Sequence, residues 1–520
     1  MKYPGRRIAA CAVLVCGFVL SCSRDASSGR PVRLAILPIE NLTNDTGLDW
    51  LGAASSAVLT YDLTGLKDVV PVRTPTIEAA RSSGATRYVE GYFEPDHGKL
   101  AFRAQLEDAA KHTVAQELRI DAAADSAVQA LDGLARQIDP RARAFPHCTA
   151  EAMRLYGEAL EGRGAMQAAV DADANCGPAY VAGGLCTGLK LPNLNAIDRL
   201  ELQYTCATAQ GDTAGRVQAL QALAPLVPAD SSVARALGEL QVALRRFPDA
   251  IRSFQAAVHA DPGDSEAWNQ LGYAQCYAGD LPAAKQSMQE YAKLVPATEA
   301  NGVDSLGEIS FFLGDFTGAE KYFLEANQKA TASAPGNELL KAAQARLMTG
   351  DVAGADALIG RPGVISDIDR ARWEFITGRR EQAIARLEKM PNSPPVAEQL
   401  AIWRAQTGKA AWPDMMSTNP LGRAIALLFA GKFADAAPIL EGMYENTNPA
   451  ADAQVRTLLA WSYVQSGRAD AARPLLNLYP IPLAGADPAL ASLVFPRFVQ
   501  LRAQVLHSQK DAKLAATLAR

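Results

Sequence analysis

Apolar residues recur at helical spacing through most of this chain, in paired runs separated by a glycine. Six of these glycines stand five residues before an alanine: Gly279/Ala284, Gly314/Ala319, Gly350/Ala355, Gly378/Ala383, Gly431/Ala436 and Gly467/Ala472. Glycine accepts the left-handed backbone that commonly ends a helix, and alanine lets the next helix pack closely. The pattern predicts stacked helical hairpins, which usually present a surface and carry no reaction centre.

The hairpins follow a regular period. Leu237-Gly238 returns 34 residues later as Leu271-Gly272, and Pro262 returns as Pro296. The segment WNQLG at 268–272 carries tryptophan, leucine and glycine in a W-x2-L-G spacing. This signature, within a helix–turn–helix of 34 residues, resembles the tetratricopeptide repeat. The resemblance implies an all-α solenoid whose first helices line a concave, protein-binding groove.

The resemblance also maps candidate groove positions onto the chain. The partner-binding candidates are Arg235, Glu239, Asn269, Tyr273, Tyr277 and Glu308. Aromatic rings supply contact area, and Asn269 can hydrogen-bond the backbone of an extended peptide or a partner helix. Phe311 and Phe312 stand nearby, where they either face the groove or fill the core between repeats.

Residues 31–122 follow a different pattern, in which short alternating runs predict strands. A turn at Asp96-His97-Gly98 joins two of them as a hairpin. The order βαβαβββ predicts a small mixed sheet with helices on one face. The expected strands are 32–36, 69–72, 88–93, 100–106 and 114–120, and the expected helices are 48–63 and 76–81.

Several short motifs in this part belong together. Leu37-Pro38 and Asn41 end the first strand and its loop, and Gly84-Ala85, Tyr88-Val89 and Gly91 mark a later strand pair. These motifs resemble the TolB amino-terminal-like domain, although Ile39 stands where that family usually has phenylalanine. The resemblance implies a domain that binds other proteins or has an unknown role, and that often precedes tetratricopeptide repeats.

The first 22 residues read as a targeting signal. Lys2, Arg6 and Arg7 precede the apolar stretch 8–20, which is too short to span a bilayer as a stable helix. It ends in VLSC at 19–22, which resembles the bacterial lipobox and implies lipidation of Cys22. An ordinary secretory signal is the alternative. Lipid at Cys22 would anchor the protein without a spanning segment, and the following serine implies the outer membrane.

The predicted fold class is therefore α+β, with a small mixed α/β domain followed by an all-α solenoid. The expected segments are a lipoprotein signal peptide (1–21), a tether (22–30), the TolB-like domain (31–122), a helix and linker (123–146) and the solenoid (147–520).

Cysteine usage fits an exported protein. After Cys22 the chain has an odd number of cysteines: Cys148, Cys176, Cys186, Cys206 and Cys276. In an oxidising compartment we expect one or two disulfides among the first four, with the pairing left open. The pairs Cys148–Cys176 and Cys186–Cys206 would each join neighbouring hairpins. Cys276 lies within a repeat helix, where we expect it to be a small packing residue.

Charge and motifs narrow the function further. The net charge is −5 and no dense basic tract exists, which argues against nucleic acid as a partner. The five histidines lie outside any nucleophile motif, and no phosphate-binding, dinucleotide or zinc-protease signature is present. We therefore expect no catalytic residue, no cofactor and no metal site.

These observations predict a non-enzymatic scaffold that is lipid-anchored in the cell envelope. It would face the periplasm, at the outer membrane, and bind partner proteins through the tetratricopeptide groove. The sequence leaves open a sensory or regulatory accessory, in which the α/β domain binds a small ligand or glycan. A catalytic function would need a pocket that the sequence does not reveal.

Overall fold

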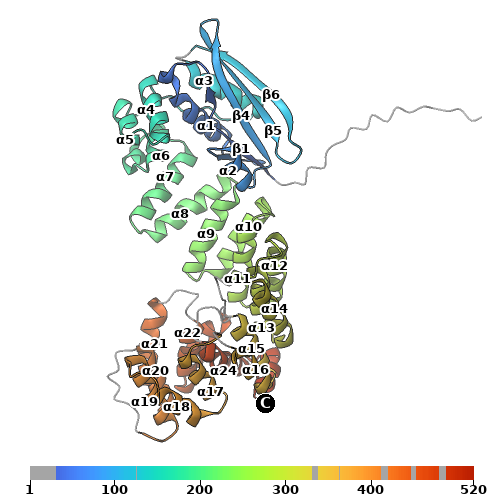
Figure 1. Cartoon of the computed structure of the whole chain (residues 1–520). Helices are drawn as coiled ribbons and strands as arrows, with labels where there is room; N and C mark the ends of the chain where they lie inside the picture. The colour runs from blue at the N-terminus through green and yellow to red at the C-terminus, as the bar shows by residue number, and fades with distance from the viewer. Residues whose placement is uncertain are drawn as a thin grey trace, which may run out of the picture.

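A sheet-containing unit lies at one end of the molecule and helices form the rest (Figure 1). This confirms the predicted fold class. The predicted signal peptide, Cys22, and the tether lie outside the described residues. The computed structural model describes residues 31–519 except 124–125, 331–337, 362–363, 411–419, 447–452 and 479–487.

The sheet has the strand order β3-β1-β4-β5-β6. Strand β1 runs parallel to both of its neighbours, whereas β4, β5 and β6 are antiparallel. His97 and Gly98 both have positive φ and form the predicted two-residue turn between β4 and β5. The bounds are β1 Val32–Ile36, β2 Glu40–Asn41, β3 Val69–Arg73, β4 Arg87–Asp96, β5 Lys99–Asp108 and β6 Thr113–Ala122. The two-residue β2, which pairs with β4, was not predicted.

Helices cover both faces of the sheet. Helices α1 (Trp50–Leu63) and α3 (Ala127–Ile138) share a core with Leu34 of β1 and Val89 of β4. The adjacent residues Ala35 and Tyr88 point the opposite way, where they pack with Ala80 of α2, Ile77–Ser82. The expectation of helices on one face only is wrong for α2, because β1 and β4 are apolar in both directions.

The core of the sheet unit continues into the first helices beyond the 123–146 segment. One cluster of buried residues runs from Leu34 of β1 to Cys206 of α7. Helices α1 and α4 approach so closely that a Cβ at Gly157 would lie 2.5 Å from the carbonyl oxygen of Trp50. The helices concerned are α4 Ala150–Leu160, α5 Met166–Ala172, α6 Gly177–Gly183 and α7 Ala196–Ala209, with the 3-10 helix η3 at Cys186–Lys190.

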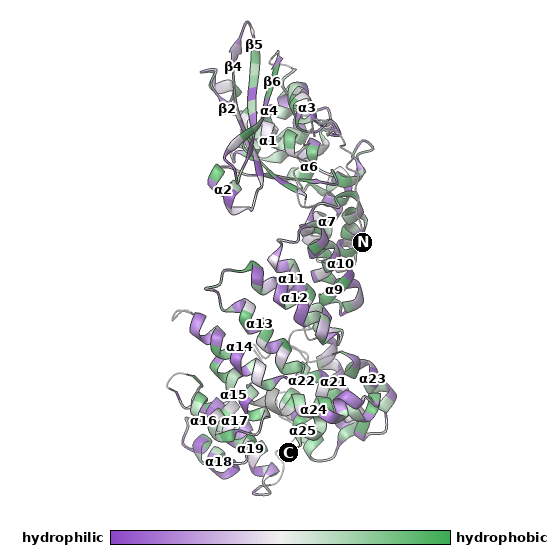
Figure 2. Ribbon diagram, turned by 90° about the vertical axis from the view of Figure 1, so that its right-hand side faces the viewer, coloured by the Kyte–Doolittle hydropathy of each residue, from purple (hydrophilic) through white to green (hydrophobic). Residues whose placement is uncertain are grey.

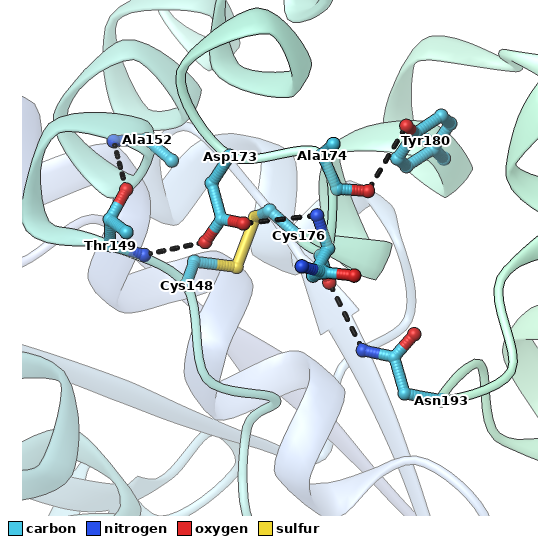
Figure 3. The surroundings of a disulfide bond; sticks show 9 residues. Cys148, Thr149, Ala152, Asp173, Ala174, Cys176, Tyr180 and Asn193 are labelled. Atoms are coloured by element: carbon cyan, nitrogen blue, oxygen red, sulfur yellow. Dashed lines mark hydrogen bonds between the residues drawn. A yellow bond between two sulfur atoms is a disulfide. The ribbon is translucent and has the colours of Figure 1, made fainter.

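Two disulfides fasten these helices together. Cys148, just before α4, is bonded to Cys176, just before α6 (Figure 3). Beside this disulfide, the backbone N–H of Thr149 donates to Asp173 Oδ2 at 2.9 Å. The second disulfide joins Cys186 of η3 to Cys206 of α7. Both pairs are those expected to join neighbouring hairpins.

The remaining helices stack as hairpins, and the glycine–alanine pattern marks their turns. All six glycines have φ between 73° and 88°, and all six alanines are 0% exposed. The prediction of helical hairpins is confirmed. The helices are α8 Thr213–Leu223, α9 Ser231–Ala243, α10 Phe247–Ala260, α11 Ser265–Tyr277, α12 Leu281–Leu294, α13 Asn301–Phe312, α14 Phe316–Lys329, α15 Glu338–Met348, α16 Val352–Ile359, α17 Asp367–Ile376, α18 Arg380–Glu388, α19 Pro394–Gln406, α20 Pro420–Phe429, α21 Phe433–Asn446, α22 Ala453–Gln465, α23 Ala469–Asn477, α24 Pro488–Leu506 and α25 Gln509–Leu518.

The C-terminal helices fold back onto the middle of the array. Helix α24 packs against α15, α17 and α22, and a single core runs from Cys276 to Val505. Figures 1 and 2 both show α22 and α24 beside α13–α17, below the sheet unit. Cys276 is buried in this core, as expected of a packing residue. The array is therefore closed on itself in its C-terminal half.

Candidate functional site

The predicted groove residues lie on three first helices of the repeats, α9, α11 and α13. On α9, Arg235 and Glu239 form an ion pair with 2.9 Å between Nη1 and Oε1. The side chains are 31% and 45% exposed, so this pair stays at the surface. Arg235 also lies 3.6 Å from Asp264, which caps the start of α11 by accepting from the N–H of Ala267.

Asn269 of α11 lies beside this pair along the array and is half-buried. Within the part of the chain that the structure describes, no donor reaches its buried Oδ1. A buried acceptor without a hydrogen bond is uncommon, because losing water without a replacement costs about 1–3 kcal/mol. Asn269 thus carries a polar atom whose hydrogen-bonding capacity is unused in this structure.

Glu308 of α13 is engaged inside the molecule. It is 1% exposed, and its carboxylate accepts from the ammonium of Lys341 at 2.8 Å and from the hydroxyl of Tyr273 at 3.0 Å. Lys341 also donates to Asp304 at 2.6 Å, and the Tyr273 oxygen lies 3.1 Å from Ser305. This buried network joins α11, α13 and α15.

The charges of the network depend on one another. Burial alone would lower the pKa of Lys341, but the carboxylates of Glu308 and Asp304 raise it, so the ammonium stays charged. Burial raises the pKa of Glu308, and Lys341 opposes that shift. Glu308 and the Tyr273 hydroxyl are therefore engaged in contacts within the array in this structure.

Tyr277 is also internal. It is 6% exposed and stacks on Phe247 with 4.9 Å between ring centroids. Ala453 of α22 and Leu478 pack against the same two rings. A partner would therefore have to displace part of the chain to reach Tyr277.

The fold-back of α24 covers the next stretch of the same face. Phe311 and Phe312 of α13 are 0% and 2% exposed, and their ring centroids lie 5.2 and 5.6 Å from that of Phe495 in α24. Of the two alternatives for these rings, the structure shows that they fill the core and do not face a groove. Lys341 and Phe495 were missed from the sequence. Lys341 follows Glu308 by 33 residues, so the repeat period could have indicated it.

A second candidate site, which we call the joint pocket, lies between the sheet unit and the first helices. Its volume is about 220 Å³. Tyr61 of α1, Arg143, Tyr156 of α4, and Asp198 and Glu201 of α7 line it, and Arg73 of β3 lies at its exposed rim. These residues come from segments far apart in the sequence, which is why sequence patterns did not reveal the pocket.

Within the described ranges, no helix is both long and apolar enough to cross a membrane. Likewise, the described residues contain no group of three or more histidine, cysteine, aspartate or glutamate side chains placed to hold a metal ion.

Comparison with known families identifies the helical part. Two models of the tetratricopeptide repeat match the chain, at residues 235–299 and 427–494. The chain contains tetratricopeptide repeats. The first matched segment includes Arg235, Glu239 and Asn269, and the second supplies helices of the fold-back. Tetratricopeptide repeats bind proteins through extended surfaces, and no enzyme family is indicated.

Several solved structures resemble part of the tetratricopeptide array. MamA protein is 16% identical, covering 38% of this chain and 98% of its own at a TM-score of 0.30. YrrB, described as a TPR protein with an unusual peptide-binding site, is 16% identical over 34% of this chain and 76% of its own, with a TM-score of 0.23. A tetratricopeptide repeat protein from Parabacteroides merdae is 13% identical over 62% and 99%, at 0.27. At TM-scores this low, nothing about this chain's function follows from them. No curated protein sequence matches the chain.

Proposed function

We propose that this protein is a non-enzymatic scaffold that holds partner proteins of the cell envelope on the periplasmic side of a membrane. The observation that carries the proposal is the open face of α9 and α11, where Asn269 has a buried acceptor that no described residue satisfies. Arg235 and Glu239 are partly exposed on α9, which contacts α11. We call these three residues the open face.

The open face suits an extended peptide segment. Once the Asn269 amide turns toward the groove, its Oδ1 would accept from a backbone N–H of the peptide, which removes the cost of the buried acceptor, about 1–3 kcal/mol. The Arg235–Glu239 pair is partly exposed and can exchange its internal contact for contacts with polar groups of the peptide. Stacked repeats hold these side chains in place before binding, which keeps the ordering cost on this side small.

The proposed location rests on the lipoprotein signal peptide expected at residues 1–21 and on Cys22, and the two disulfides support it. Lipidation at Cys22 would place the folded chain at a membrane surface, which we propose to be the outer membrane. Disulfides persist in oxidising compartments such as the periplasm, and Cys148–Cys176 and Cys186–Cys206 are both bonded in this structure. The TolB-like resemblance of residues 31–122 agrees with a protein-binding role in the envelope.

Site-specific crosslinking tests the groove. A photoreactive residue in place of Glu239 should capture an envelope protein in cells, and Asn269→Ala should weaken that capture about tenfold without destabilising the fold. Gln289→Ala is the matched control, since Gln289 is an exposed amide on the second helix α12. Equal capture by the Asn269→Ala and Gln289→Ala proteins would refute the role of the open face.

Lipidation is tested separately. Cys22→Ala should abolish incorporation of labelled palmitate and release the protein into the soluble periplasmic fraction. Membrane association that survives the substitution would rule out the lipid anchor and leave the groove proposal standing.

A further inference from the structure

The joint pocket has the size and the walls of a small-molecule site. Its volume of about 220 Å³ equals the space of about seven water molecules in liquid water, at roughly 30 Å³ each. One wall belongs to α1 of the sheet unit, and the other walls belong to α4, α6 and α7. The α/β domain therefore supplies only part of the site.

The walls are tied together covalently. One disulfide joins the segments that lead into α4 and α6, through Cys148 and Cys176. The other fastens α7 through Cys206. Gly157 of α4 lies directly against Trp50 of α1, so these two helices cannot separate without losing close packing. Such a pocket is largely formed before a ligand arrives, which lowers the cost of binding.

Two carboxylates line the pocket. Asp198 is 3% exposed, and one of its oxygens accepts from the hydroxyl of Tyr61 at 2.9 Å. Glu201 follows one turn later on α7. Among the described residues, neither carboxylate has a cation within ion-pair distance. Burial, reinforced by Asp198 and opposed by Arg143, raises the pKa of Glu201 to about 7, so a ligand ammonium beside Glu201 would favour its charged form.

Two guanidinium groups also line the pocket. Arg143 stacks on the ring of Tyr61 with its guanidinium carbon 4.3 Å from the centroid, and its Nη2 donates to the Tyr61 carbonyl at 2.7 Å. Arg73 adds a second cation at the rim. No described carboxylate forms an ion pair with Arg143 or Arg73. Buried charges are normally paired, yet Arg143 acts on Asp198 and Glu201 only at longer range and forms no direct ion pair with either.

A ligand that carries both charges would satisfy the carboxylates and the guanidinium groups. We propose that the joint pocket binds a small zwitterion, namely a free amino acid or a compound with the same ammonium and carboxylate ends. The ammonium contacts Glu201 and Asp198, and the carboxylate contacts Arg143 and Arg73. Ala57, Val181 and Ile197 provide an apolar wall for a short side chain. The inference is independent of the open face on α9 and α11.

Calorimetric titration of the purified full chain with each of the twenty amino acids tests this assignment. We expect at least one to bind, and its N-acetyl and amide forms each to bind at least tenfold more weakly, because each blocked form lacks one charge. Glu201→Gln should weaken binding of the free amino acid at least tenfold, whereas Glu381→Gln, at a site on α18 that is 85% exposed, should leave it unchanged.

The blocked compounds are tested on the unaltered protein, so they decide the question even if Glu201→Gln disturbs folding. Absence of binding by all twenty amino acids at millimolar concentration would overturn the proposal. Equal binding of the free and N-acetyl forms would exclude the ammonium contact, and equal binding of the amide form would exclude the carboxylate contact. Either result would also overturn it.

Discussion

Substitution of Lys341 by methionine tests whether the buried network holds the tetratricopeptide array together. The change keeps most of the side-chain volume but removes the ammonium that lies 2.8 Å from Glu308 and 2.6 Å from Asp304. Glu308 is 1% exposed, so water cannot replace the lost partner. Removing one member of a buried ion pair typically costs about 3–5 kcal/mol, and we expect Lys341→Met to fall in that range.

The size of the loss depends on whether Glu308 stays ionised. Burial already raises the pKa of Glu308, so the glutamate can take up a proton once Lys341 is gone. Where its new pKa lies below the solution pH, this protonation costs about 1.4 kcal/mol for each pH unit of difference. The double variant Lys341→Met/Glu308→Gln has no charge at position 308 and should recover part of the lost stability. The recovered part measures the coupling between the two residues.

Hydrogen exchange of the amides in α11, α13 and α15 is the suitable assay, because a chain of this size need not unfold in one step. Lys293→Met is the matched control: this lysine on α12 is 66% exposed and pairs with Glu290, a kind of contact worth about 0–1 kcal/mol. The network does not hold the array together if the Lys341 variant loses no more protection than the Lys293 variant, or if the double variant is no more protected than the single one.

Three other changes have definite expected outcomes. Phe495→Ala removes the ring that covers Phe311 and Phe312 and should cost about 3–5 kcal/mol, measured as faster hydrogen exchange in α13 and α24. Burial, with Asp132 adding to it, raises the pKa of Asp62 from 3.8 to about 9, so the native state binds a proton that the unfolded state releases. Stability should therefore fall as pH rises between about 4 and 9, and Asp62→Asn should flatten a denaturation-versus-pH series. Gly157→Val would push a side chain against the Trp50 carbonyl and should lower the melting temperature of the sheet unit. The control Gly162→Val lies at an open turn with φ of 76°, so it should lower the melting temperature less, through backbone strain alone.

Local features of the fold were predictable from the sequence because they depend on residues close together in the chain. A glycine before an alanine sets the hairpin turn wherever it occurs, and His97-Gly98 sets the turn of the β4–β5 hairpin. The placement of α2 was harder to predict, because it depends on which face of β1 and β4 is apolar enough to require a helix over it. Both sides are apolar, and alternation alone did not show this.

Contacts between distant segments were not predictable in this way. From the sequence alone, Phe311 and Phe312 are equally compatible with the groove and the core. Their ring contacts with Phe495 of α24 show that they belong to the core. The joint pocket likewise needs Tyr61, Arg143 and Glu201 to meet from separate helices and a linker. Glu308 is the instructive case: its position in the repeat was predicted, but its partner Lys341 makes it part of the interior.

The composition of the first helices explains why the array is closed in one half and open in the other. Helix α13 presents Phe311 and Phe312, and burying each ring stabilises the fold by about 1.5–3 kcal/mol, so a helix of the same chain covers them. Helix α9 presents Arg235 and Glu239, which lose hydration if an apolar helix covers them. The partner of the open face should therefore be a polar, extended segment. An amphipathic helix with a large apolar stripe would suit the face of α13, which α24 already occupies.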